Sequence, residues 1–216
     1  MRQTRKKATS KRVAKKTTAG RSSGAPESLD LSQSPVDIIS LEGLQPRTLV
    51  APHFRLFELI RSETATRQGI DNRFSSIQEL HAAIHLAREV MEPIREAFGS
   101  FTPNSVFRGQ ALERALKRKP ADWISRSQHT KGEACDVEIV GLPTLELAQW
   151  AEHHLPQFDQ IICECYDPAK GPNAGWVHIS LKPPGAGSNR KRTLSYVKDP
   201  ASNRMVYVEG LRPTVA

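Results

Sequence analysis

Two histidines and one aspartate give this sequence the residue types of a metal site. His129 and Asp136 are seven positions apart, and Gly132 between them lets the backbone turn so that the carboxylate returns toward the imidazole. His178 follows 42 positions after Asp136, inside a short apolar stretch. Two imidazoles and one carboxylate can make the three-ligand site of a catalytic zinc ion. A chain with seven histidines and 23 acidic residues contains many such triples, so surface or core roles stay open at this point.

The surrounding sequence predicts the elements that must position these residues. Ser76, with Glu79 three positions on, has the spacing of a helix capping box, and Pro93 should kink the helix that begins there. Helices first and short strands later favour an α+β fold with helices packed on one antiparallel sheet. The helices are expected over 62–68, 76–98, 110–117 and 144–154, and the strands over 105–107, 137–140, 160–166, 176–181, 193–197 and 205–208.

The net charge of +8 is located in the first 24 residues. These contain nine Lys or Arg and no acid, so residues 25–216 carry a net charge of −1. Because so polar a segment cannot offset its ordering entropy, we expect residues 1–24 to be a disordered basic tail. It would act as a solubilising or flexible tether, or it would adhere to a polyanion such as teichoic acid, nucleic acid or anionic lipid. Residues 25–52, with four prolines, are expected to form a linker with a short strand at 36–41.

Several classes of protein are excluded by what the sequence lacks. No apolar stretch approaches the roughly 18 to 20 residues of a membrane-spanning helix, and the basic N-terminus lacks the apolar region of a secretory signal. Three cysteines are too few for a disulfide framework. We therefore expect a protein made in the reducing cytoplasm, without a secretory signal and without a transmembrane segment.

The segment 127–136 reads Ser-x-His-x-x-Gly-x-Ala-x-Asp, and Trp-x-His follows at 176–178. Together they strongly resemble the zinc D-Ala-D-Ala carboxypeptidase-like peptidases, which share a fold with vancomycin-resistance dipeptidases, phage L-alanyl-D-glutamate endopeptidases and the Hedgehog signalling domain. The resemblance implies a Hedgehog/DD-peptidase-like domain at 53–211, followed by a short C-terminal tail at 212–216. It also implies that Zn²⁺ is the cofactor and that His129, Asp136 and His178 are its ligands.

The same resemblance offers two candidates for a general base. Several relatives carry an acid three residues before the second histidine, where this chain has Gly175. Others carry the acid on the preceding strand, which points to Glu164. Alternation along that strand would turn Glu164 away from Cys163 and toward the site, although a solvent-facing Glu164 is the alternative. Asp159 is the reserve candidate.

Three further residues are implied at the substrate side of the site. By resemblance, Arg108 would bind a substrate carboxylate or stabilise the oxyanion, and a structural salt bridge is the competing interpretation. Ser127 would shape the metal loop and reach the substrate. Trp176 stands where many relatives have another histidine, and we expect it to contact substrate. The Lys- and Arg-rich insertion at 114–126 would modify the rim of the site.

The sequence thus predicts a zinc-dependent hydrolase of the peptidoglycan stem peptide, of the carboxypeptidase or the endopeptidase type. It would act as a monomer at the bacterial cell wall, as a phage lysin or a virion component. The alternative is a catalytically weak or inactive virion or wall-binding module of the same fold, favoured by Gly175 and Trp176. A nucleic-acid-associated protein is a second alternative, which rests only on the basic tail.

Overall fold

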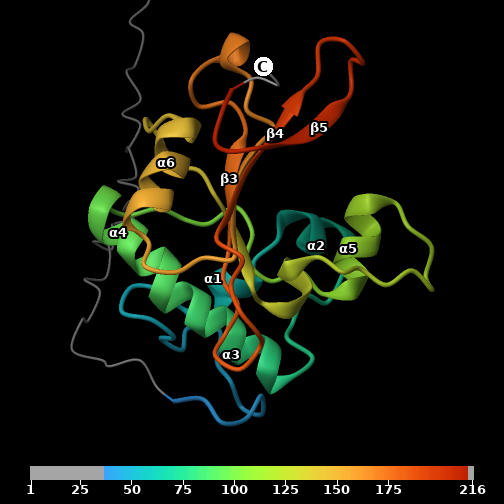
Figure 1. Ribbon diagram of the computed structural model, residues 1–216. Helices are drawn as coiled ribbons and strands as arrows, with labels where there is room; N and C mark the ends of the chain where they lie inside the picture. The colour runs from blue at the N-terminus through green and yellow to red at the C-terminus, as the bar shows by residue number, and fades with distance from the viewer. Residues whose placement is uncertain (1–36, 214–216) are drawn as a thin grey trace, which may run out of the picture. The chain divides into compact units, whose positions relative to one another are not determined.

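Five short strands form one sheet in the order β1-β3-β2-β4-β5 (Figure 1). The computed structural model describes residues 37–213, an α+β arrangement as the sequence predicts. The expected wholly antiparallel sheet is wrong in one pair, because β2 and β4 run parallel. The chain leaves β3 and passes to the far side of β2, so β4 runs in the direction of β2. The strands are β1 (Ala134–Val137), β2 (Gln160–Glu164), β3 (Trp176–Ser180), β4 (Arg192–Lys198) and β5 (Met205–Glu209).

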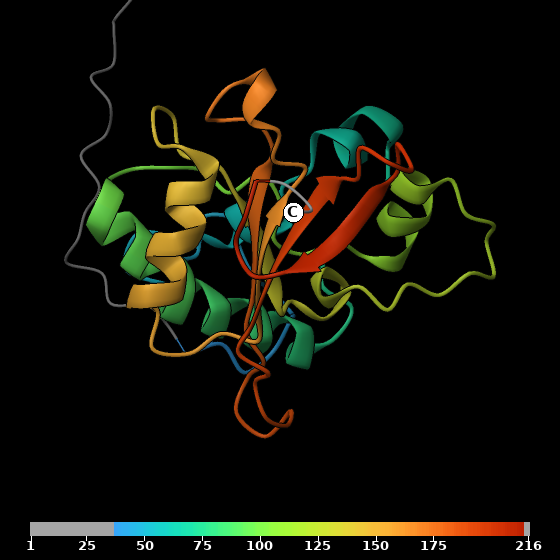
Figure 2. The same cartoon turned by 45° about the horizontal axis from the view of Figure 1, so that its top comes forward.

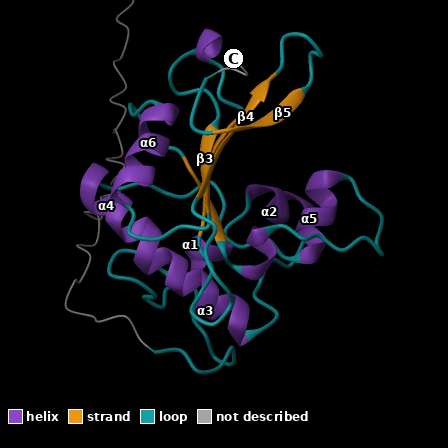
Figure 3. Ribbon diagram, in the orientation of Figure 1, coloured by secondary structure: helices purple, strands orange, loops and turns teal. Residues whose placement is uncertain are grey.

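Helices lie on both sides of this sheet (Figure 3). In both cartoon views α4 and α6 lie on one side, and α2 and α5 lie on the other (Figure 2). Within residues 37–213, none of the helices combines the length and the hydrophobicity that spanning a lipid bilayer requires. The helices are α1 (Leu56–Ile60), α2 (Glu63–Gln68), α3 (Ile77–Leu86), α4 (Glu92–Phe98), α5 (Gln110–Lys117) and α6 (Thr144–His154), with a π-helical turn η1 (Ala87–Met91) and two 3-10 turns, η2 (Gln128–Lys131) and η3 (Pro168–Lys170).

The long helix expected over 76–98 forms with the predicted start and an adjustment at its proline. The Ser76 hydroxyl accepts a hydrogen bond from the Glu79 amide at 3.2 Å, and the Glu79 carboxylate accepts one from the Ser76 amide at 3.2 Å, which confirms the capping box. The segment passes through the π-helical turn η1 immediately before α4. Pro93 lacks the N–H that would bond to the carbonyl of Glu89, and this carbonyl lies inside η1.

The two faces of the sheet have different roles, because side chains alternate along each strand. One face contributes apolar side chains to the core, where α3 packs on β1 and α6 packs on β2 and β3. The opposite face carries polar side chains at its centre and is where the candidate site lies. The core face includes Cys135, Val137, Ile161, Cys163, Val177 and Ile179, and the other face includes Asp136, Ile162, Glu164, Trp176 and His178.

Residues 37–52 belong to this domain and are not a free linker. Ile38, Val50 and Ala51 are buried in the core. The ring Nε2 of His81 lies 2.6 Å from the Ile38 carbonyl, and Arg88 Nε donates to the Val50 carbonyl at 2.9 Å. The expected linker therefore does not hold over 37–52, and the expected strand does not form over 37–41. The basic tail at 1–24 and the remainder of the linker lie outside the described residues.

Candidate metal centre

Strand pairing brings Asp136 and His178 together. They are direct cross-strand partners in the β1–β3 register, and Asp136 Oδ1 lies 3.0 Å from His178 Nδ1. His129 lies in η2, just before β1, and its Nε2 is 3.2 Å from each of those two atoms. All three side chains are buried. The strand expected at 137–140 is shifted to Ala134–Val137, because pairing with β3 fixes its position, so Asp136 lies within the strand.

The geometry of these donor atoms fits a zinc ion. His129 Nδ1 lies 2.6 Å from the Val106 carbonyl, which can only accept, so Nδ1 carries the proton and the lone pair of Nε2 points to the other two groups. Ligands about 2.0–2.2 Å from a tetrahedral zinc are about 3.3–3.5 Å apart. The observed separations of 3.0–3.2 Å are close to that value.

The electrostatics of the group favour the protonation states that a metal requires. Burial by itself would raise the pKa of Asp136, but the two neighbouring imidazoles hold that pKa well below its usual range. Burial lowers the pKa of His129. An ionised carboxylate and a neutral imidazole are the forms that bind metal. Arg108 Nη2 lies 3.1 Å from Asp136 Oδ2, so the carboxylate is held on its second oxygen as well.

Gly132 ends the η2 turn and allows the metal loop to approach α3. Its φ is +73°, the left-handed region that favours glycine. A Cβ atom at this position would lie 2.3 Å from the backbone carbonyl oxygen of Glu79 in α3. The turn inferred from the sequence between His129 and Asp136 is therefore confirmed, and close packing against α3 is a second reason for the glycine.

Replacing Gly132 with alanine is expected to lower the free energy of unfolding by more than about 2 kcal/mol, because both the φ angle and the contact with Glu79 become strained. Gly141→Ala is the matched control: its φ is +83°, yet a Cβ there meets no atom of the described part of the chain within 4 Å. That variant should lose only about 1 kcal/mol. Urea unfolding of both variants measures the difference, and equal losses would contradict the packing argument.

Glu164 lies on the site face of the sheet, at the end of β2. It is the direct partner of Trp176, while His178 is opposite Ile162, so Glu164 and His178 are diagonal neighbours. Such diagonal positions are about 7–8 Å apart, within reach of a long side chain. Cys163 points into the core, as alternation predicts. Burial raises the pKa of the half-buried Glu164, and the neighbouring His178 opposes this rise.

Gly175 has no room for the acid that several relatives carry at the corresponding position. Its φ is +77°, and an added Cβ would lie 2.1 Å from the backbone carbonyl oxygen of Glu164. A carboxylate at 175 is therefore sterically excluded in this chain. Close backbone packing therefore explains why this chain has glycine at 175 and not an acid. The candidate base on the preceding strand, Glu164, lies diagonal to His178.

Asp159, the reserve base, is engaged elsewhere. Its fully buried carboxylate accepts hydrogen bonds from the Arg190 amide at 3.0 Å and from Gln128 Nε2 at 3.0 Å, and it pairs with the Arg190 guanidinium. Lys182 Nζ lies 3.2 Å away. These contacts fix the segment between β3 and β4 at the opposite end of β2 from Glu164. Asp159 therefore holds the fold together at that end.

Asp159→Asn is expected to destabilise the protein by about 3 kcal/mol at pH 7, because it leaves Arg190 and Lys182 without their buried partner. Burial alone would raise the pKa of Asp159, but hydrogen bonds from Arg190 hold it well below its usual range. The stabilisation is thus fully present above the unfolded pKa of about 4 and is lost as the pH falls from there through the lower pKa of the folded state. Urea unfolding at pH 7 and pH 3 should show a smaller difference at pH 3; an undiminished difference would refute this account.

A cavity of about 580 Å³ opens in front of Asp136. Arg108 and Trp176 line it, and Leu116 extends to it from the insertion at 114–126. Arg108 also pairs with Asp136, so the structural salt bridge and the position at the cavity, which were competing interpretations of this residue, are both present. Ser127 directly precedes η2, and its carbonyl accepts hydrogen bonds from the amide and hydroxyl of Thr130 at 3.0 and 2.7 Å. The remaining lining residues include Arg61, Ser62, Glu63, Thr64, Asn104 and Glu138.

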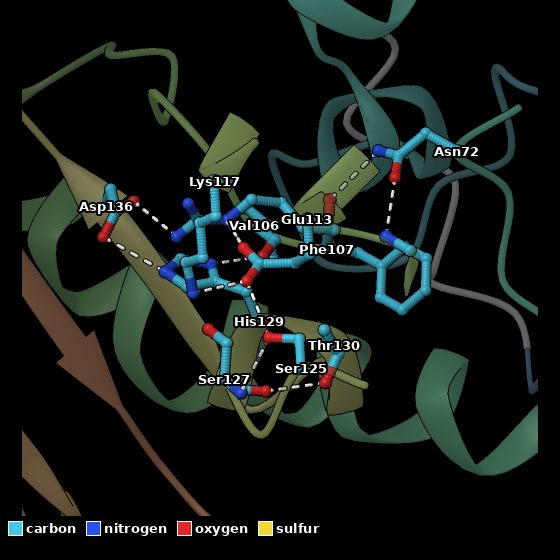
Figure 4. Close-up of polar contacts among 12 residues, drawn as sticks. Asn72, Val106, Phe107, Glu113, Lys117, Ser125, Ser127, His129, Thr130 and Asp136 are labelled. Carbon is cyan, nitrogen blue, oxygen red and sulfur yellow. Dashed lines mark hydrogen bonds and ion pairs between the residues drawn. The ribbon is translucent and has the colours of Figure 1, made fainter. Parts of the chain in front are cut away.

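Two residues near the site were missed from the sequence. Asn72 donates to the Phe107 carbonyl at 3.0 Å and accepts from the Gly109 amide at 2.8 Å, so it holds the segment that carries Arg108. Glu113 is fully buried among polar groups of the site (Figure 4). Glu113 lies on an amphipathic helix with Lys117 four positions on, so its local sequence gives no sign of this burial.

A buried group of two imidazoles and a carboxylate beside an open cavity has the donor set and the access of a catalytic metal site. A family model described as Peptidase M15 matches residues 52–179, more than half of the chain and a range that contains all three ligand candidates. The chain therefore belongs to the peptidase M15 family, the zinc D-Ala-D-Ala carboxypeptidase-like metallopeptidases. The predicted family and α+β fold class are confirmed. No curated protein and no solved structure matches the chain.

Proposed function

We propose that this protein is a zinc-dependent hydrolase of peptidoglycan stem peptides, of the D-Ala-D-Ala carboxypeptidase or the endopeptidase type. The observation that carries the proposal is the convergence of His129, Asp136 and His178 on one buried point beside a cavity. Membership of the peptidase M15 family supports zinc as the metal and an amide as the bond that is cut.

Each residue has a role that its position supports. His129, Asp136 and His178 would hold the zinc, which when bound supplies a Lewis acid that polarises the amide carbonyl. Glu164 accepts a proton from the attacking water and donates it to the leaving amine. Its burial raises its pKa and so makes it the stronger base. Arg108, at the cavity wall, donates to the substrate carboxylate or to the developing oxyanion.

We further propose that the protein acts as a monomer at the bacterial cell wall, as a phage lysin or a virion component. The nine basic residues of segment 1–24 would hold it on anionic wall polymers such as teichoic acid. Trp176 and Ser127 would contact the stem peptide beside the metal. Support for Trp176 comes from its place in the cavity lining.

The proposal is tested with purified protein, metal analysis and a defined muropeptide. Stoichiometric zinc with release of free D-Ala supports a carboxypeptidase, and stoichiometric zinc with new internal amino termini supports an endopeptidase. Asp136→Asn serves as the metal-site control and should release neither product. Stoichiometric zinc without any cleavage would overturn the hydrolase and favour the wall-binding module.

A further inference from the structure

Four charges of alternating sign run from the metal centre into α5. Asp136 Oδ2 lies 3.1 Å from Arg108 Nη2, and Arg108 Nε lies 3.4 Å from Glu113 Oε1. The other Glu113 oxygen, Oε2, lies 2.6 Å from Lys117 Nζ. Figure 4 shows Glu113, Lys117 and Asp136 in one polar group around His129. Arg108 is thus held between two carboxylates, one of which is a candidate metal ligand.

Burying the Glu113 carboxylate at this position costs free energy. Its side chain has no exposed surface, and burying a carboxylate is unfavourable unless it is well paired. Burial would raise its pKa, but Lys117, Ser125 and Arg108 together bring the pKa below the usual value, so Glu113 is ionised. An apolar residue beside Leu112 would fill the same position without this cost, so stability alone does not explain the charge.

The contact between Glu113 and Arg108 is an ion pair without a hydrogen bond. Arg108 Nε and Glu113 Oε1 are both buried, and neither has a hydrogen-bond partner among residues 37–213. Glu113 therefore attracts Arg108 by charge while leaving it free to keep its hydrogen bond to Asp136. Since Arg108 lines the cavity, the N–H groups of its two Nη atoms that Asp136 does not use can donate to a ligand there.

Glu113 also reaches the segment that carries His129. The Ser125 hydroxyl donates to Glu113 Oε2 at 2.7 Å, and the Ser127 amide donates to the same hydroxyl oxygen at 3.2 Å. Ser127 is the residue at which the η2 turn of His129 begins. The carboxylate of Glu113 is therefore the point at which the Arg108 segment and the His129 segment meet.

We propose that Glu113 is a positioning residue of the metal centre. Its negative charge partly neutralises Arg108, which also pairs with Asp136. Arg108 therefore neutralises less of the charge of Asp136, and the carboxylate binds the metal more strongly. Its second oxygen anchors, through Ser125, the loop that presents His129. The contribution of Glu113 to catalysis rests on the proposed function, whereas its contribution to metal affinity does not.

The test compares Glu113→Gln with wild type in the full chain, with zinc affinity measured by competition against a chelator. We expect affinity to fall about tenfold or more, as for other residues that orient metal ligands. Cleavage of the muropeptide should fall with it. Glu92→Gln is the matched control, because Glu92 is also buried and lies in α4, on the other side of the sheet. Its carboxylate pairs with His53 at 2.8 Å. This variant should lower the melting temperature and leave zinc affinity unchanged.

A second variant covers the case in which Glu113→Gln does not fold. Ser125→Ala removes only the hydroxyl that joins Glu113 to the His129 loop and should weaken zinc binding severalfold. Zinc affinity that is unchanged in both variants, or reduced equally in Glu92→Gln, overturns the proposal. If the wild type binds zinc but cuts no muropeptide, the proposed function fails, and the ratio of zinc affinities still decides the role of Glu113.

Discussion

Replacing His178 with alanine is expected to remove stoichiometric zinc and to lower peptide hydrolysis by at least about a thousandfold. His178 Nδ1 lies 3.0 Å from Asp136 Oδ1 and 3.2 Å from His129 Nε2, so its loss takes away one of three converging donors. Two donors do not make a catalytic zinc site. A metal contributes several kcal/mol of transition-state stabilisation, and each 1.36 kcal/mol is a factor of ten in rate. Metal content after dialysis and the rate on a muropeptide measure the two losses.

His154→Ala is the control for this experiment. His154 is an exposed histidine of α6, stacked on Trp150 on the core side of the sheet. It should retain full zinc and full activity, which separates the loss of a ligand from the loss of any histidine. Circular dichroism should show both variants folded. A His178→Ala protein that keeps one zinc per chain and wild-type activity would rule out His178 as a ligand.

The parts of the fold set by local sequence could be predicted, and those set by distant pairing could not. The capping box at Ser76 and the apolar period of α5 and α6 specify helices through contacts a few residues apart. The position of β1 differs from the predicted 137–140, because Val137, Ile139 and Val140 have the composition of a strand while the register with β3 decides where pairing occurs. Val140 is fully exposed, outside the strand. The parallel β2–β4 pair likewise depends on sheet order.

The site shows the same division. The ligand triple could be proposed because the motif at 127–136 brings its residues close in sequence and Trp-x-His places the third on a strand. The role of Glu113 could not be predicted from the sequence. With Lys117 four positions further on, Glu113 has the pattern of a solvent-exposed ion pair on a helix. It becomes a buried group only when Arg108 and Ser125 are brought to it. Residues 37–52 differ from the predicted linker for a similar reason. Their prolines are visible in the sequence, whereas their burial depends on contacts with distant segments such as those of His81 and Arg88.

Glu164→Gln is expected to retain zinc and to lower kcat by a factor of about 10² to 10⁴, the usual contribution of a general base. The amide has the shape of the carboxylate but cannot take a proton from water. Because Glu164 is diagonal to His178 and is not one of the three ligand candidates, the metal site should stay intact. Metal analysis together with single-turnover hydrolysis of a muropeptide separates this result from that of His178→Ala.

The pH profile provides a further test of Glu164 as the base. A base works only when ionised, so activity should rise with pH through the pKa of Glu164, which burial raises above the ordinary value for glutamate. This acidic limb should disappear from the residual activity of Glu164→Gln. Glu209→Gln is the matched control, because Glu209 is an exposed glutamate on the same face of the sheet, paired with Arg192 in the next strand, and its profile should equal that of the wild type. If the limb persists in Glu164→Gln, another group accepts the proton.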